Sequence, residues 1–263
     1  MNSGPIGIID SGFGGLAIAQ AIWRRLPKES ILYLADHQFF PYGQKSVIEI
    51  NRRLVKLINF LLGKKVKLVV IACNTITMNS IDFLRRLFPI PFIGTAPAIK
   101  PAIVNNFKEN IIVWATPATV KSHNFKKLIS VLDKKRQVKT FGCPHLAQDI
   151  ERLALQPEKL KQSIKKILAA TPKPFSALVL GCTHYLLVKD LIASLLPLGV
   201  VLIDPSEAIA VQTERVLLKY RLDFYGSGER IFFTTGSNLN LKLLNLIASS
   251  LLKQSIIFKR CSI

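Results

Sequence analysis

Two stretches of the chain place a cysteine between similar neighbours. Residues 68–75 read LVVIACNT, and residues 177–184 read ALVLGCTH. Each begins as an apolar run typical of a buried parallel strand and continues into helical periodicity. Open α/β sheets bind their ligands at the carboxyl ends of the strands. We therefore predict that Cys73 and Cys182 present thiols to the two sides of one small molecule.

The matching contexts separate these two cysteines from the others. A lone cysteine in an apolar segment is most often a small buried hydrophobic residue, and Cys143 and Cys261 keep that interpretation. Cys73 and Cys182 instead precede helices, whose N-termini stabilise thiolates, so we expect lowered pKa values for both. A disulfide between them is the lesser alternative.

Polar side chains follow both thiols directly. Asn74 and Thr75 follow Cys73, and Thr183 and His184 follow Cys182. Hydroxyl and amide groups there suit a bound carboxylate, and they also cap helices, a role that coexists with binding. Beside an activated thiol, His184 is expected to act as an acid/base or orienting partner. Because neither C-x-x-C nor H-x-x-x-H occurs, we predict no metal site.

The first 36 residues predict a strand, a glycine-rich turn, a helix and a second strand. Gly12, Gly14 and Ala17 match the weak G-x-G-x-x-G/A dinucleotide fingerprint, with Asp36 at the end of the second strand. However, Asp10 would repel a pyrophosphate at the helix N-terminus and is better suited to an ammonium group. A dinucleotide-binding oxidoreductase therefore remains only an alternative, and a strand-to-helix turn also explains the glycines.

The rest of the chain repeats this outline. Cys73 lies 63 positions after Asp10, and Cys182 lies 66 positions after Thr116. We predict an α/β fold of two similar three-layer domains with mainly parallel sheets and the active site in the cleft between them. The first domain comprises 1–96 plus 206–263, and the second comprises 97–205. The remaining expected strands lie at 92–94, 111–115, 138–141, 200–203 and 231–234. One helix is expected at 46–62, one ends at Leu87 and one ends at Leu132. Two more precede the second cysteine strand, one of them opened by Pro157, another follows a cap at 204–207, and the last begins at Asn238.

Composition narrows the class of protein. The chain has 263 residues, 49% of them apolar and 8% aromatic, which fits a compact globular protein. No apolar run reaches membrane-spanning length, we see no signal peptide, and four cysteines suggest a reducing compartment, so we expect a cytoplasmic protein without a membrane partner. The net charge is +20, but its basic residues are scattered and not interleaved with aromatics, so nucleic acid is not an expected partner.

The segments 10–16, 41–43, 72–75, 116–120 and 181–185 resemble, in order, the motifs of bacterial glutamate racemases, of the aspartate/glutamate racemase family. The resemblance spans nearly the whole chain. It implies a cofactor-independent racemase that holds glutamate between two α/β domains and supplies D-glutamate for peptidoglycan. The resemblance does not fix the oligomeric state, and a homodimer is one of the alternatives.

The resemblance also implies roles for individual residues. Cys73 and Cys182 match the catalytic acid/bases, with Cys73 serving D-glutamate and Cys182 serving L-glutamate. Asp10, His184 and Glu151, an acidic residue expected near the second cysteine, match assisting positions. The substrate-binding positions are matched by Asp10, Ser11, Pro41, Tyr42, Gly43, Asn74, Thr75, Thr116, Thr119, Thr183 and His184.

The chain departs from the motifs at two places. Leu186 stands where relatives commonly have proline, and Trp114 lies in a stretch where some have glycine. Neither change removes a functional side chain, although Trp114 is expected to alter packing beneath Thr116. The nearest alternative function is racemisation of aspartate or another acidic amino acid, and a pyridoxal enzyme is a more distant one.

Overall fold

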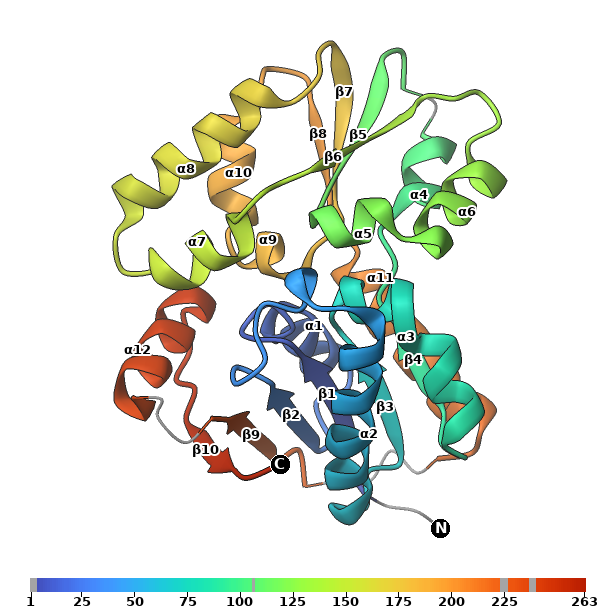
Figure 1. The fold of residues 1–263 in the computed structure, drawn as a ribbon, viewed down its shortest axis with the longest axis vertical. Helices are drawn as coiled ribbons and strands as arrows, with labels where there is room; N and C mark the ends of the chain where they lie inside the picture. The colour runs from blue at the N-terminus through green and yellow to red at the C-terminus, as the bar shows by residue number, and fades with distance from the viewer. Residues whose placement is uncertain (1–3, 106, 223–226, 237–239) are drawn as a thin grey trace.

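All ten strands of the described chain lie in two parallel sheets, one in each lobe of the molecule (Figure 1). The computed structural model describes residues 4–105, 107–222, 227–236 and 240–263. The lower sheet has the order β10-β9-β2-β1-β3-β4, and the upper sheet has the order β6-β5-β7-β8. The order β2-β1-β3-β4 thus recurs in the second lobe as β6-β5-β7-β8, which supports the predicted repeat.

The strands are short and their burial follows their position. Central strands are buried throughout because helices cover both faces of the sheet, as their continuous β-branched and leucine sequences predict. Their bounds are β1 (Ile6–Asp10), β2 (Ile31–Ala35), β3 (Leu68–Ile71), β4 (Phe92–Gly94), β5 (Asn110–Ala115), β6 (Val138–Gly142), β7 (Phe175–Leu180), β8 (Val201–Ile203), β9 (Arg230–Thr235) and β10 (Phe258–Cys261).

The helices begin and end at recognisable signals. Ser46 and Glu49 form a capping box at the start of α2, and Pro157 opens α8. The bounds in the lower lobe are α1 (Leu16–Arg25), the 3₁₀ turn η1 (Tyr42–Gln44), α2 (Val47–Gly63), α3 (Asn74–Leu87), α11 (Ser206–Lys219) and α12 (Leu241–Leu252). Those in the upper lobe are α4 (Ile99–Val104), α5 (Pro117–Lys121), α6 (His123–Leu132), α7 (Leu146–Arg152), α8 (Pro157–Ala170), α9 (Thr183–Leu187) and α10 (Lys189–Leu195).

Several predicted boundaries are wrong for local reasons. The single helix expected up to Leu132 is broken at Ser122, whose extended backbone and side chain cap a new helix. Helix α4 and strand β10 were not predicted. At the predicted cap of the next helix the N-cap residue is Pro205, and the Asp204 carboxylate before it accepts bonds from the amide and hydroxyl of Ser206. The predicted start of the last helix at Asn238 lies outside the described residues, and α12 is capped by Asn240.

The chain passes between the lobes after β4 and again after β8, and β9 and β10 return to the lower sheet. Helix α11 packs on α1 of the lower lobe. We propose that the domains meet at these two crossings, with 1–96 plus 206–263 in one and 97–205 in the other. No helix within the described residues is both long and apolar enough to cross a membrane.

Buried Asp36 ties together three parts of the lower lobe. Its carboxylate accepts hydrogen bonds from Tyr42 Oη at 2.6 Å, Thr235 Oγ1 at 2.6 Å and Arg53 Nη2 at 2.6 Å. The Asp36 side chain is fully buried and that of Arg53 is 10% exposed. A dinucleotide ribose would find this carboxylate already occupied, which argues against the oxidoreductase alternative.

We expect Asp36→Asn to lower the free energy of unfolding by about 3–5 kcal/mol, because it leaves the largely buried Arg53 without its counter-charge. Urea unfolding measures this loss. Asp82→Asn is the matched control: Asp82 is 61% exposed and pairs with Arg85 at 3.5 Å, so its removal should cost less than about 0.5 kcal/mol. A cost below about 1 kcal/mol for Asp36→Asn would contradict the assignment.

Candidate active site

The two lobes enclose a small cavity at the carboxyl ends of β1, β3, β5 and β7. Both Cys73 and Cys182 line it, as the matching contexts in the sequence predict. Cys73 follows β3 and caps α3, and Cys182 follows β7 and caps α9. The other lining residues are Ser11, Phe40, Pro41, Tyr42, Gly43, Asn74, Thr75, Thr116, Ala147, Thr183 and His184.

Parallel register brings these strand ends together. Ile9 of β1 pairs with Ile71 of β3, so Asp10 and Cys73 emerge at the same edge of the lower sheet. In the upper sheet Trp114 of β5 pairs with Leu180 of β7, so Thr116 and Cys182 also emerge together. Each lobe therefore supplies one thiol and one polar residue, at equivalent positions of the repeated topology.

Cys73 is held as a neutral thiol in this closed arrangement. Burial, the Asp10 carboxylate and the facing Cys182 raise its pKa to about 12, although the Ile76 amide at the start of α3 opposes them. The prediction of a lowered pKa is therefore wrong for Cys73. The helix N-terminus acts in the predicted direction, but desolvation of a thiolate costs more than one amide returns. Ser11 Oγ lies 3.9 Å from the sulfur.

Asp10 lies beneath the cavity and binds across the lobes. Its oxygens accept hydrogen bonds from the Gly12 amide at 3.0 Å and from Thr183 Oγ1 at 3.0 Å. Burial raises the pKa of Asp10, and His184, the Gly12 amide and Thr183 offset this rise only in part. Thr183 is thus engaged with the carboxylate that the sequence assigns to a substrate ammonium.

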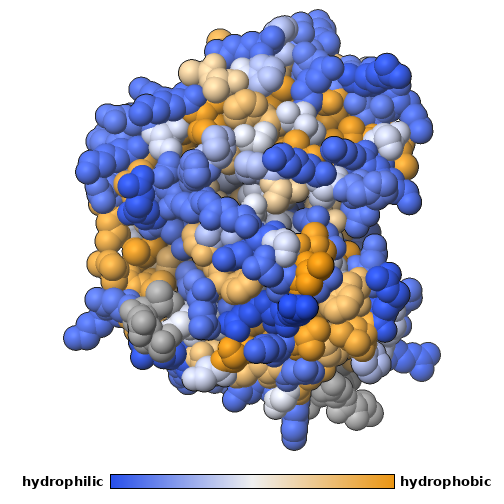
Figure 2. All heavy atoms as spheres, in the orientation of Figure 1, coloured by the Kyte–Doolittle hydropathy of each residue, from blue (hydrophilic) through white to orange (hydrophobic). Residues whose placement is uncertain are grey.

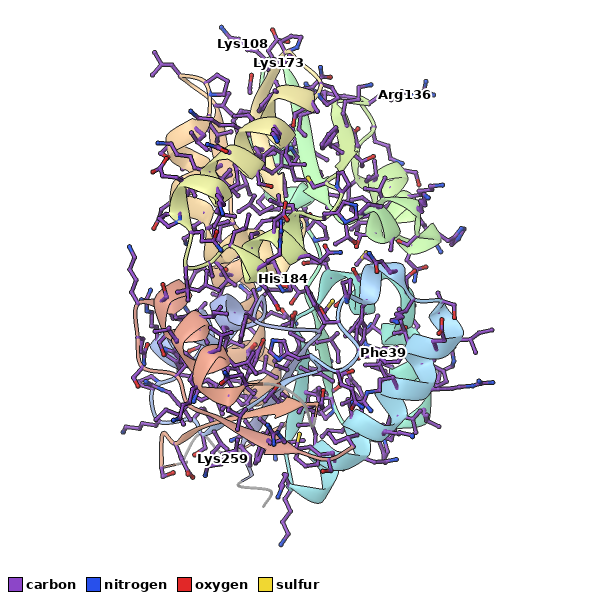
Figure 3. All side chains as sticks on the ribbon, turned by 60° about the vertical axis from the view of Figure 1, so that its left-hand side comes forward. Phe39, Lys108, Arg136, Lys173, His184 and Lys259 are labelled. Atoms are coloured by element: carbon purple, nitrogen blue, oxygen red, sulfur yellow. The ribbon has the colours of Figure 1, made fainter. Side chains whose placement is uncertain are left out.

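His184 and Glu151 form a buried ion pair beside Cys182. Glu151 Oε1 lies 2.7 Å from His184 Nε2 and also accepts a bond from the Phe13 amide at 2.9 Å. Burial alone would lower the pKa of His184, but Cys182 and Glu151 outweigh burial and raise it well above its usual value. Burial would raise the pKa of Glu151, yet the His184 bond and the nearby His37 lower it. The pair is therefore charged, and Figure 3 shows His184 at the junction of the lobes.

Three threonine hydroxyls form a second polar group on the other side of the cavity. Thr75 Oγ1 lies 3.1 Å from Thr116 Oγ1 and 3.3 Å from Thr119 Oγ1, and Thr116 donates to Thr119 at 2.9 Å. Thr75 belongs to the lower lobe and the other two to the upper lobe. Next to them, Asn74 Nδ2 donates to the Thr95 carbonyl at 2.8 Å. These hydroxyls can turn toward a carboxylate that enters between the lobes.

The structure brings together every residue that the sequence nominated, but not all of them reach the cavity. Asp10, Thr119 and Glu151 are not among the lining residues and are in hydrogen-bond contact with Thr183, Thr75 and His184, which are. The Tyr42 hydroxyl is bound to Asp36, so only its ring and the neighbouring loop face the cavity. Phe40 and Ala147 line the cavity without having been predicted; Phe40 stacks on His184, with ring centroids 5.3 Å apart. No motif marked either of them.

The family model for Asp/Glu/hydantoin racemases matches residues 6–213 of the chain. The chain belongs to this family. A glutamate racemase of Clostridium novyi is 38% identical over 217 residues, which cover 82% of this racemase and 84% of that relative. The crystal structure of glutamate racemase isoform RacE1 of Bacillus anthracis is 32% identical, with a TM-score of 0.84 and coverage of 99% and 98%. The Escherichia coli glutamate racemase, in complex with L-glutamate and the activator UDP-MurNAc-ala, is 29% identical, with a TM-score of 0.85 and coverage of 98% and 97%.

The two residues that depart from the family's motifs, Trp114 and Leu186, are core residues of this racemase. Trp114 is fully buried in the upper lobe, where its Nε1 donates to Thr171 Oγ1 at 2.9 Å and its ring meets Tyr185 edge-on. Leu186 is 4% exposed and joins the same core. Both residues are therefore core residues, and neither lines the cavity; an effect of Trp114 on packing beneath Thr116 stays a prediction. Among the described residues, no three His, Cys, Asp or Glu side chains form a group that could hold a metal ion.

Proposed function

We propose that the chain is a glutamate racemase that interconverts L- and D-glutamate by a two-thiol mechanism without a cofactor. The observation that carries the mechanism is the pair of buried thiols, one from each lobe, on a single cavity. Racemisation removes the α-proton from one face and returns a proton to the other. A single base would tend to restore the starting enantiomer, so two opposed acid/bases suit the reaction.

The polar groups around the thiols support the individual roles. Cys182 takes the proton from L-glutamate, and the His184–Glu151 pair lies beside it as its orienting partner. Cys73 takes the proton from D-glutamate. The carbanion is strongly basic, so the hydroxyls of Thr75, Thr116 and Thr119 and the amide of Asn74 are assigned to the carboxylates, where fixed dipoles stabilise the developing charge.

Asp10 is assigned to the substrate ammonium. A protonated amino group withdraws charge from the α-carbon, and a carboxylate beside it keeps it protonated. Thr183 Oγ1 donates a hydrogen bond to Asp10 Oδ2 in the closed structure. This bond must break before that oxygen can accept one from the substrate ammonium. Ser11, next to Cys73, and the loop of Pro41, Tyr42 and Gly43 complete the walls of the site.

Glutamate enters only when the lobes separate. The enclosed cavity measures about 20 Å³, whereas sites for small molecules commonly measure about 300–1,000 Å³. Thr183, Glu151 and the threonine group all bond across the lobes, so opening breaks these contacts and closure restores them around the substrate. Closure thereby removes water from a reaction that needs a strong base.

We assign glutamate and not aspartate as the substrate because relatives and structural neighbours that are 38%, 32% and 29% identical are glutamate racemases, one of them with L-glutamate bound. We expect L-glutamate incubated with the purified protein and no added cofactor to lose its circular dichroism. A methylene distinguishes the two amino acids, so L-aspartate should react about 10- to 200-fold more slowly. Equal or faster turnover of aspartate would reassign the substrate, and turnover of neither would refute the function.

The cellular role and the partners follow from this assignment. D-glutamate supplies peptidoglycan synthesis and so contributes to cell shape. A cytoplasmic location agrees with four free cysteines. Figure 2 shows hydrophilic residues spread over both lobes, which supports the view that the charge of +20 is a solvated surface and not a nucleic-acid site. A homodimer stays a prediction.

A further inference from the structure

His37 is a buried imidazole that no motif singled out. It follows Asp36 just beyond the end of β2, and its side chain is 5% exposed. The rings of Phe13 and Phe258 pack against it, with centroid distances of 4.5 Å and 6.2 Å. Because apolar rings cover it on these sides, the two ring nitrogens must find their partners in the remaining directions.

One nitrogen of His37 has a partner that fixes its tautomer. Nδ1 lies 2.8 Å from Thr234 Oγ1, and the Thr234 hydroxyl donates its own proton to the Thr235 carbonyl at 3.2 Å. On this basis we assign the Thr234 oxygen as the acceptor and place the Nδ1 proton on His37. In the neutral ring, Nε2 is then a bare lone pair.

The other nitrogen faces the active-site carboxylate. Nε2 of His37 lies 3.7 Å from Glu151 Oε2, and it has no hydrogen-bond partner within the part of the chain that the structure describes. Glu151 Oε1 is already taken by His184 Nε2 at 2.7 Å and by the Phe13 amide. Two imidazoles thus share one buried carboxylate, and only one of them is hydrogen-bonded to it.

We propose that His37 is a positioning residue for the Cys182 half of the reaction: a proton taken from solvent at Nε2 pairs His37 with Glu151 Oε2 and weakens the hold of Glu151 on His184. The proposal rests on the proposed function, because it assigns the His184–Glu151 pair to Cys182. In the neutral state of His37, Glu151 serves His184 alone. In the protonated state, two cations share one carboxylate, and Glu151 holds His184 less firmly in its place beside Cys182.

The surroundings of His37 determine the pH range in which its Nε2 takes up a proton. Burial lowers the pKa of His37, and the charge of His184 lowers it further, while Glu151 and Asp36 oppose the shift. The neighbours from β9, β10 and the turn before α1 are Thr234, Phe258 and Phe13, which carry no charge. His37 is therefore neutral at pH 7 and takes its proton below the ordinary histidine value of about 6.5.

The test compares the pH dependence of kcat/KM for glutamate in wild type, His37→Asn and His37→Gln. Neither variant can titrate. In both, the acid limb of log kcat/KM should move at least about half a pH unit lower, because the competing cation is absent. The deciding measurement is the position of the acid limb and not the rate at pH 8, because neutral His37 makes no hydrogen bond to Glu151.

The exposed His123 gives the matched control, since His123→Asn removes an imidazole that does not line the cavity and should leave the profile unchanged. A merely structural role for His37 would lower kcat/KM or Tm without moving the acid limb, and an unmoved limb overturns the proposal. Absence of racemisation in the wild type would instead refute the proposed function.

A measurement on the wild type protects the test against variants that fail to fold. Nitrogen-15 NMR of the four histidines distinguishes a bare ring nitrogen from a protonated one. We expect one histidine to carry its proton on Nδ1 alone at pH 7 and to gain the Nε2 proton below about pH 6.5. If the resonance that disappears in His37→Gln shows a proton on Nε2 at pH 7, the proposal is wrong.

Discussion

Cys73→Ala and Cys182→Ala each lower kcat/KM for the racemisation of glutamate by about 10⁴-fold, the upper end of the range for a lost acid/base. Each face of the α-carbon has one thiol, and either thiol alone leaves a carbanion without a proton donor on one face. Because the two enantiomers have equal free energies, kcat/KM must fall equally in both directions. Circular dichroism of L-glutamate and of D-glutamate, followed separately, measures the two rates.

The remaining cysteines provide the controls for this experiment. Cys143 is 2% exposed and lies in the upper lobe, so Cys143→Ala removes a buried thiol of the same kind as Cys182 without touching the cavity. Cys261→Ala removes a half-buried thiol of the lower lobe that does not line the cavity. Both should keep kcat/KM within about 3-fold, although Cys143→Ala loses some stability through a small cavity. Retention of a tenth or more of wild-type activity by either active-site variant would end the two-thiol mechanism.

The position of the site could be predicted because it depends on the ends of buried parallel strands. Apolar runs that stop at a small residue and a cysteine identify those ends without any long-range information. The repeat placed Thr116 at the same sheet edge as Cys182 for the same reason. Both predictions use only local sequence and the rule that ligands bind at the carboxyl edge of a parallel sheet.

What could not be predicted depends on residues distant in the chain. Asp36 looked like a ribose ligand because its partner Thr235 lies 199 positions away. The raised pKa of Cys73 arises from burial between two lobes, which no local pattern reports. His37 has no motif at all, since its role follows from an Nδ1 contact with β9 and an Nε2 contact with α7. Strand β10 is a short edge strand with two exposed basic residues, so its sequence shows little strand pattern.

Gly14→Ala should reduce kcat/KM by about 100-fold while the fold stays intact. A Cβ built on Gly14 would lie 2.5 Å from Thr183 Oγ1, 2.6 Å from His184 Nδ1 and 2.7 Å from the His184 amide nitrogen. The side chains could turn away, but the His184 amide belongs to α9 and cannot move alone. The lobes must therefore shift apart, and a misplacement of about 1 Å at a catalytic site costs about 100-fold.

The backbone at Gly14 tolerates alanine, because its φ lies outside the left-handed region. Loss of activity should consequently come from incomplete closure, with a Tm within about 3 °C of wild type. Gly63→Ala, at the end of α2 with open space around the new Cβ, should leave kcat/KM unchanged. If Gly14→Ala kept wild-type kcat/KM, the close approach of the first glycine turn to α9 would not be needed for turnover. If it instead unfolded, Gly14 would matter for the lower lobe itself and not for the meeting of the two lobes.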